Sequence, residues 1–144
     1  MTGEQRFDDW ELLAQVSQTY RALSDDFINR IAMHRAQAGL LCRLFANDGI
    51  TQSEIAEQLS VQGATVTNIL QRMEEAGLVT RRRDLDDNRL VRVFLTDAGR
   101  QKERAITEQF VQLESAVFDG ISEPERALLR RLLRQMLHNM TVKA

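Results

Sequence analysis

The feature of this sequence that most constrains its fold is a pair of short helical segments separated by three residues. The first, residues 51–59, begins with Thr51 and Glu54, which form a capping box in which each side chain accepts the backbone N–H of the other residue. The second, residues 63–76, repeats apolar residues at steps of three and four, and Gly77 follows it. The pattern therefore predicts two short helices joined by a tight turn.

A segment with the period of a β-strand follows these helices. Residues 78–83 alternate in character, residues 84–89 are rich in turn-forming side chains, and Val91, Val93 and Leu95 then place apolar groups on one face. We expect a β-hairpin here. A hairpin directly after two short helices predicts a winged helix-turn-helix.

Longer helices are expected on the N-terminal side. From Leu13 to Ile31, apolar residues recur at alternating steps of three and four, which predicts a long amphipathic helix. A second helix passes through Leu40 and Phe45, and we expect Gly49 to close it.

Two more helices are expected on the C-terminal side. Thr96 is placed to cap a helix that ends near Gly120, and Ser122 with Glu125 forms a second capping box that opens the last helix. The fold class is therefore mainly α with a small β-hairpin wing. We expect one domain, with a DNA-binding lobe at about residues 35–99 and dimerisation helices at about residues 7–31 and 97–142. The apolar seams of these terminal helices exceed what one small winged lobe can cover, so a homodimer is expected.

The net charge of the chain and the distribution of its basic residues point to different conclusions about nucleic-acid binding. The formal net charge of -2 and the pI of about 5.7 count against nucleic-acid binding when taken alone, because neutralising phosphates requires positive charge. All but two of the 19 basic residues are arginine, however, and several of them lie between residues 81 and 92. A local basic patch can exist on an acidic protein.

Several classes of function lack their motifs. Cys42 is the only cysteine, which excludes an internal disulfide framework and a multi-thiolate metal site, and His34 and His138 have no metal-ligand spacing. The sequence has no glycine-rich phosphate loop, nucleophile elbow or cofactor fingerprint, so we expect no enzyme activity, no cofactor and no metal. The acidic start and the lack of an apolar run of roughly 18 residues predict a cytoplasmic protein.

The outer face of the second short helix is polar and short-chained. Asn and Gln can pair with adenine in the major groove, small residues allow close approach, and Arg72 suits a phosphate. The alternative is a merely solvated helix surface. The candidate DNA-binding residues of this helix are Ala64, Thr65, Thr67, Asn68, Gln71 and Arg72.

The hairpin carries five arginines that we expect to gather around one tip: Arg81, Arg82, Arg83, Arg89 and Arg92. Arginine is favoured electrostatically in a narrow minor groove. The loop also contains Asp84, Asp86 and Asp87, so a hairpin that neutralises its own charge is the alternative.

The stretch GLVTRRRDLDDNRLVRVFLTDAG, residues 77–99, resembles the wing of the MarR family of bacterial and archaeal regulators. The shared pattern is the Gly-Leu-Val lead-in, a basic pair, an acidic loop, an Asp-x-Arg motif and Leu-Thr-x-x-Gly. The segments TQSEIAEQL and VTNILQRMEEAGLV are similar to the family's helix-turn-helix. Two positions depart from the family pattern: Asn88 stands where arginine is frequent, and Asn68 stands where some relatives have a base-reading arginine.

The resemblance implies a homodimer on double-stranded DNA with a palindromic operator. It assigns the minor-groove arginine to Arg89, with Arg81, Arg82 and Arg83 nearby, and gives Asp87 the role of orienting Arg89 through a charge-assisted hydrogen bond. It further implies a repressor that a small aromatic or anionic ligand releases, and Tyr20, His34 and Arg43 are the candidate ligand-binding residues.

Two alternatives stay open. A winged helix can serve as a protein-protein interaction module, although such a surface would more often expose an apolar anchor. Cys42 could act as a redox sensor, although its apolar surroundings favour a small packing residue.

Overall fold

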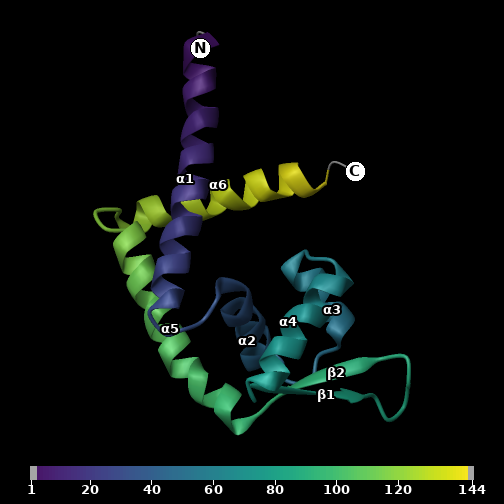
Figure 1. The fold of residues 1–144 in the computed structure, drawn as a ribbon. Helices are drawn as coiled ribbons and strands as arrows, with labels where there is room; N and C mark the ends of the chain where they lie inside the picture. Colours follow the sequence, from purple (N-terminus) through teal and green to yellow (C-terminus); the bar gives the residue numbers. More distant parts are fainter. Residues whose placement is uncertain (1–2, 143–144) are drawn as a thin grey trace. The chain divides into compact units, whose positions relative to one another are not determined.

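A computed structural model describes residues 3–142 of the chain. The elements are α1 (Gly3–Asn29), α2 (Arg35–Ala46), α3 (Gln52–Leu59), α4 (Gly63–Glu75), β1 (Val79–Arg83), β2 (Val91–Leu95), α5 (Asp97–Val117) and α6 (Glu123–Thr141) (Figure 1). The predicted order of helices and strands is confirmed, and the fold is a winged helix-turn-helix with long helices before and after it.

The chain divides into two compact units, one up to Phe110 and the other from Val111 onward. The division falls inside α5. Helix α1 and the part of α5 up to Phe110 therefore belong to the same unit as the helix-turn-helix and the wing.

The core of the first unit lies among α2, α3, α4 and the hairpin. The apolar side chains at the centre of this core are fully buried, and their removal from water is the main source of stability for this unit. The fully buried side chains there include Leu40, Leu41, Leu44, Ile55, Val66, Leu70, Met73 and Val93.

Local chemistry sets the boundaries of α3 and α4. The Thr51 Oγ accepts the Glu54 N–H at 3.1 Å, and the Glu54 carboxylate accepts the Thr51 N–H at 3.1 Å, so the predicted capping box is present. Ser60 then takes a left-handed conformation, with φ at 53°, which ends α3 after its second turn. Gly77, with φ at 75°, follows α4.

Two predicted helix ends were wrong by a few residues. Helix α1 ends at Asn29 instead of Ile31, because the chain turns at Ala32, where φ is 56°. Helix α2 ends at Ala46 and not at Gly49. The Gly49 N–H instead donates to the Val93 carbonyl at 2.9 Å, so this glycine joins the edge of the hairpin.

The hairpin pairs β1 and β2 in antiparallel register, with Arg81 opposite Val93, Arg82 opposite Arg92 and Arg83 opposite Val91. The segment before α3 extends this small sheet, since the Val93 N–H donates to the Ile50 carbonyl at 3.0 Å. The hairpin is therefore anchored to the start of the helix-turn-helix by backbone hydrogen bonds.

Where the hairpin leads into α5, the backbone at Gly99 lies very close to the backbone of Leu78. The Thr96 hydroxyl accepts the Gly99 N–H at 3.1 Å and donates to the Gly77 carbonyl at 2.5 Å, so it caps α5 as predicted and ties it to the end of α4. A Cβ at Gly99 would lie 2.1 Å from the Leu78 carbonyl oxygen. Only glycine fits there.

The second unit consists of the end of α5 and α6. The predicted capping box of Ser122 and Glu125 opens α6, with the Ser122 N–H donating to the Glu125 carboxylate at 2.9 Å. Arg126 pairs with Glu114 and lies 4.5 Å above the ring of Phe118. No residue of α6 that the structure describes is buried.

Candidate nucleic-acid interface

Helix α4 buries one face and presents the other to solvent. Val66, Leu70 and Met73 are fully buried. The predicted DNA-facing side chains are all exposed: Ala64, Thr65, Thr67, Asn68, Gln71 and Arg72. The burial pattern thus separates the core face of α4 from a polar outer face along its length.

These polar side chains differ in how free they are to meet a ligand. The Thr67 hydroxyl donates to the Gly63 carbonyl at 3.0 Å and accepts the Gln52 side-chain N–H at 2.6 Å. Its only proton is therefore committed inside the protein. The Gln71 amide makes a long contact of 3.4 Å to Glu75, and the amide of Asn68 has no hydrogen-bond partner in the described part of the chain. Asn68 and Gln71 are the side chains best placed to meet a base edge.

Gln52 was not singled out by the sequence. It is the first residue of α3, and its amide joins α3 to α4 through Thr67 across the turn between them. The residue lies 15 positions away from Thr67 along the chain, so no local pattern connects the two.

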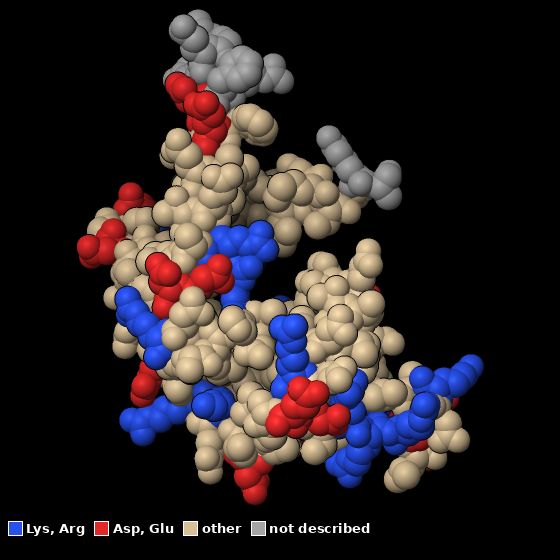
Figure 2. All heavy atoms as spheres, viewed as in Figure 1, with Lys and Arg blue, Asp and Glu red and all other residues tan. Residues whose placement is uncertain are grey.

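The five hairpin arginines do not form one cluster at the tip, which corrects the prediction. Figure 2 shows basic side chains gathered over the hairpin region, but each arginine has its own surroundings. Arg81 and Arg83 alternate with Arg82 along β1, and Arg92 lies on β2 opposite Arg82. Strand alternation sends neighbouring residues to opposite faces, so consecutive arginines cannot gather on one side.

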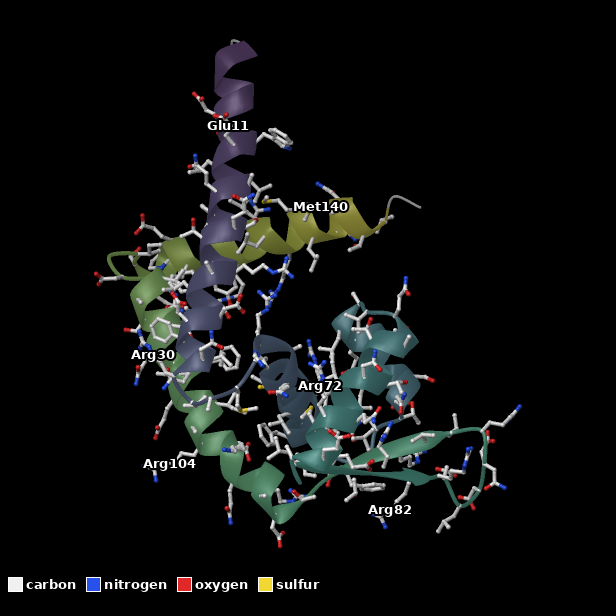
Figure 3. All side chains as sticks on the ribbon, in the orientation of Figure 1. Glu11, Arg30, Arg72, Arg82, Arg104 and Met140 are labelled. Carbon is white, nitrogen blue, oxygen red and sulfur yellow. The ribbon has the colours of Figure 1, made fainter. Side chains whose placement is uncertain are left out.

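Arg81 and Arg82 are held along the strand. The Arg81 side chain pairs with Glu74 at 3.2 Å, and its backbone N–H donates to the same carboxylate at 2.9 Å. These two bonds, the backbone bond first, hold the pKa of Glu74 below its usual range. The Arg82 guanidinium, labelled in Figure 3, lies 4.1 Å from the centre of the Phe94 ring.

Arg89 is the arginine that projects from the turn, and its side chain is 89% exposed. Its Nε and Nη2 each donate to the Asp87 carboxylate at 3.0 Å, and its backbone N–H donates to the same carboxylate at 3.1 Å. The side-chain bonds are the first cause of the lowered pKa of Asp87, so this carboxylate is charged at neutral pH. The bidentate pair restricts an otherwise flexible side chain without covering it.

Asp84 and Arg92 form the base of the turn, and the sequence did not indicate that they would pair with each other. Asp84 accepts the backbone N–H groups of Asp86 at 2.8 Å and Asp87 at 3.0 Å. Its other oxygen pairs with the Arg92 Nε, and the Arg92 Nη1 donates to the Gly49 carbonyl at 2.9 Å. An aspartate that accepts backbone N–H groups two and three residues later is a known feature of turns, so the sequence could have indicated this role for Asp84. The link to Gly49 has no local signal.

Comparison with known proteins agrees with this arrangement. The sequence model of the MarR family matches residues 33–91. An HTH-type transcriptional regulator of Bacillus subtilis, YdgJ, is 29% identical over 133 residues, which cover 92% of this chain and 81% of the relative. The HTH-type transcriptional repressor IacR of Pseudomonas putida is 28% identical, over 89% of this chain and 77% of the relative. The crystal structure of an S. aureus MepR-DNA complex superposes with a TM-score of 0.81 at 29% identity, covering 90% of this chain and 96% of that chain.

The chain is therefore similar to the MarR family in its helix-turn-helix segment, in its relatives and in its fold. MarR proteins are transcriptional regulators, a non-enzymatic class, and this agrees with the prediction that the chain is not an enzyme. No helix among residues 3–142 has the length and apolar character that a membrane span requires. Within the same residues, His, Cys, Asp and Glu nowhere gather into a group of three that could hold a metal ion.

None of the residues proposed to bind an effector lines either of two hollows found in the second unit. The two hollows on the second unit, of about 390 and 190 Å³, are lined by residues between Val111 and Leu133. Tyr20 is 48% exposed on α1, His34 precedes the first turn of α2, and Arg43 is exposed near the end of α2. Their assignment to a ligand stays a prediction.

Cys42 is half-buried on α2 and packs against the core. Burial raises the pKa of its thiol, an effect that Arg43 opposes by its charge. A raised pKa reduces the thiolate fraction, and the thiolate is the form that reacts with oxidants. The surroundings of Cys42 therefore favour packing over redox sensing.

Proposed function

We propose that this protein is a regulator of the MarR family: a sequence-specific, double-stranded DNA-binding repressor that acts as a homodimer on a palindromic operator. The observation that carries the proposal is the joint exposure of the α4 polar face and of Arg89, which Asp87 holds in a bidentate pair. Both features expose groups that recognise DNA, and both stand on the same compact unit.

The two elements are assigned different tasks. Asn68 and Gln71 expose amides that can read base edges in the major groove, and Arg72 offers a positive charge to a phosphate. Arg89 supplies a guanidinium to the minor groove, and the charge of Asp87 next to a phosphate backbone is tolerable because it is neutralised by Arg89. Major-groove contacts then give specificity, while the wing contributes mainly affinity.

The homodimer is supported by apolar surface on the terminal helices. Large side chains stay exposed along α1 and α6 in the single chain: Trp10, Leu12, Val16, Tyr20, Leu128, Leu132, Leu133, Leu137 and Met140. Exposed apolar side chains repeated along a helix in this way favour an interaction site. We assign about residues 7–31 and 97–142 to dimerisation and about residues 35–99 to DNA binding, and a two-fold dimer then requires a palindromic operator.

The repressor role and release by a small aromatic or anionic ligand complete the proposal. A relative, IacR, is a transcriptional repressor, and another, MepR, has been crystallised with DNA. The test is selection of bound duplexes from a random pool, with and without aromatic carboxylates. We expect an inverted repeat with half-site centres about 34–36 Å apart. Recovery of no preferred sequence would reject sequence-specific binding and favour a protein-docking module.

A further inference from the structure

Arg92 lies in the middle of the wing, yet its side chain faces the protein. It stands opposite Arg82 across the hairpin, where two like charges would repel each other. The repulsion is relieved because Arg82 stacks on Phe94 while Arg92 turns toward Asp84 and the Gly49 carbonyl. The carboxylate of Asp84 is only 13% exposed and the Arg92 side chain 38%.

Arg92 thus connects two segments that are distant in sequence. Its Nη1 donates at 2.9 Å to the carbonyl of Gly49, which precedes α3 by three residues. Backbone pairing reinforces this link, because Thr51, the N-cap of α3, forms a bridge with Arg92. The Nη1 of the Arg92 guanidinium is therefore bound to the segment that begins the helix-turn-helix.

The Nε of the same guanidinium is linked through Asp84 to the tip of the wing. Arg92 Nε pairs with Asp84, and the second oxygen of Asp84 accepts the N–H groups of Asp86 and Asp87. Asp87 in turn binds Arg89 through two side-chain hydrogen bonds. A continuous series of polar contacts runs from Gly49 through Arg92, Asp84 and Asp87 to Arg89.

We propose that Arg92 and Asp84 are positioning residues, which hold the exposed Arg89 at a fixed place relative to α3 and α4 so that wing and recognition helix meet DNA as one rigid surface. This inference rests on the proposed function, since it needs Arg89 to contact DNA. A fixed Arg89 loses less side-chain and loop entropy on binding than a mobile one, which strengthens the complex without adding a contact. Asp84 is ionised at neutral pH, and its hydrogen bond from Arg92 holds the pKa of Asp84 below its usual range.

The alternative is that Arg92 binds DNA directly. A double-mutant cycle separates the two roles, because residues that act through one another are not additive. The affinity for a selected operator duplex would be measured for the parent, R92Q, R89A and the double variant R89A/R92Q. We expect R92Q to weaken binding roughly three- to ten-fold in the parent, a part of what losing Arg89 costs. In the R89A background the same change should alter affinity by less than about two-fold.

Two further variants serve as controls for the loss of positive charge in R92Q. R92K keeps the charge but cannot reach Asp84 and Gly49 together, because lysine lacks the planar fork. We expect it to lose affinity as R92Q does. R104Q also removes one arginine charge, from a side chain that is 90% exposed and lies on α5 on the far side of the unit from the hairpin turn (Figure 3). Arg104 is not among the exposed apolar side chains on α1 and α6 that support the proposed dimer. It should bind within about two-fold of the parent, because a single distant surface charge is largely screened.

The outcomes discriminate among the hypotheses. Equal losses from R92Q in both backgrounds, or parental affinity for R92K, would overturn the positioning role while leaving the wing contact intact. If R89A itself binds like the parent, the wing contact of the proposed function fails, and the positioning role fails with it. Thermal melting tests whether each variant is folded. If R92Q has a clearly lower melting temperature than the parent, D84N replaces it in the double-mutant cycle, because it weakens the same Arg92–Asp84 pair.

Discussion

Helices α4 and α6 have similar amphipathic patterns but opposite burial. Helix α4 buries Val66, Leu70 and Met73, whereas α6 buries none of its described residues, and Leu137 is 59% exposed. Apolar spacing therefore identifies the face of a helix that must be buried, but it does not identify the segment that buries it. For α4 the cover comes from α2, α3 and the hairpin. For α6, our proposal assigns the cover to a second copy of the chain.

The largest expected effect comes from making the same change in both helices. Leu70→Ala removes a fully buried side chain, so it should lower the free energy of unfolding by about 2–5 kcal/mol. Leu137→Ala should cost less, and its cost should vary with protein concentration if a second copy covers that face. Chemical denaturation at several protein concentrations measures both. A concentration-independent loss of equal size at Leu137 would contradict the comparison.

Leu137→Glu places a charge on the exposed face of α6. If this face is a dimer interface, burial of an unpaired carboxylate is costly and the variant should be monomeric at micromolar concentration. Light scattering should report 16.5 kDa for the variant and twice that mass for the parent. Trp10, the only tryptophan, is 71% exposed in the single chain, so its emission offers a second signal of assembly. A monomeric parent would remove the basis for a palindromic operator.

The outer face of α4 and the wing should fail in different ways. Asn68→Ala should cost about 1–3 kcal/mol on the preferred operator and little on random duplex, because it removes base reading. Arg89→Ala should weaken binding on all sequences and reduce the slope of log affinity against log salt by about one. Titration of both variants on operator and random duplex at several salt concentrations tests this.

Removal of Asp87 tests the orienting role separately. Asp87→Ala should imitate Arg89→Ala in part, since it releases the bidentate contact that holds Arg89. If Asp87 only repelled phosphate, its removal would instead strengthen binding. The sign of the change therefore decides between the two roles.

Most of the fold was predictable because its boundaries are set by neighbours in sequence. The capping boxes at Thr51 and Ser122 and the cap at Thr96 form as expected, since each needs only residues three positions away. The wrong ends, at Ile31 and Gly49, lie where the chain leaves a helix to meet another segment. Tertiary contacts decide such positions.

The arrangement of the site was less predictable than its location. The sequence placed Asn68 and Gln71 on the outer face of α4, because helical period alone determines that face. It could not show that Arg92 would turn away from Arg82, because its partner Gly49 lies 43 positions earlier. Nor could it show that Gln52 would bind the hydroxyl of Thr67.

The smallest expected effect is at Cys42, which sits in the covered region of the molecule. The thiol packs beside the core, and burial raises its pKa, so few molecules carry the reactive thiolate at neutral pH. We propose that regulation changes the separation of the two DNA-binding lobes of the dimer and needs no covalent change at this residue. Cys42→Ser should therefore bind operator DNA like the parent, and mild peroxide should leave both proteins bound. Both would be titrated on the operator before and after peroxide, with thermal melting to check that the serine is tolerated. If the parent releases DNA on oxidation while the serine variant stays bound, the thiol is accessible and reactive, and Cys42 belongs with the functional surface instead of the core.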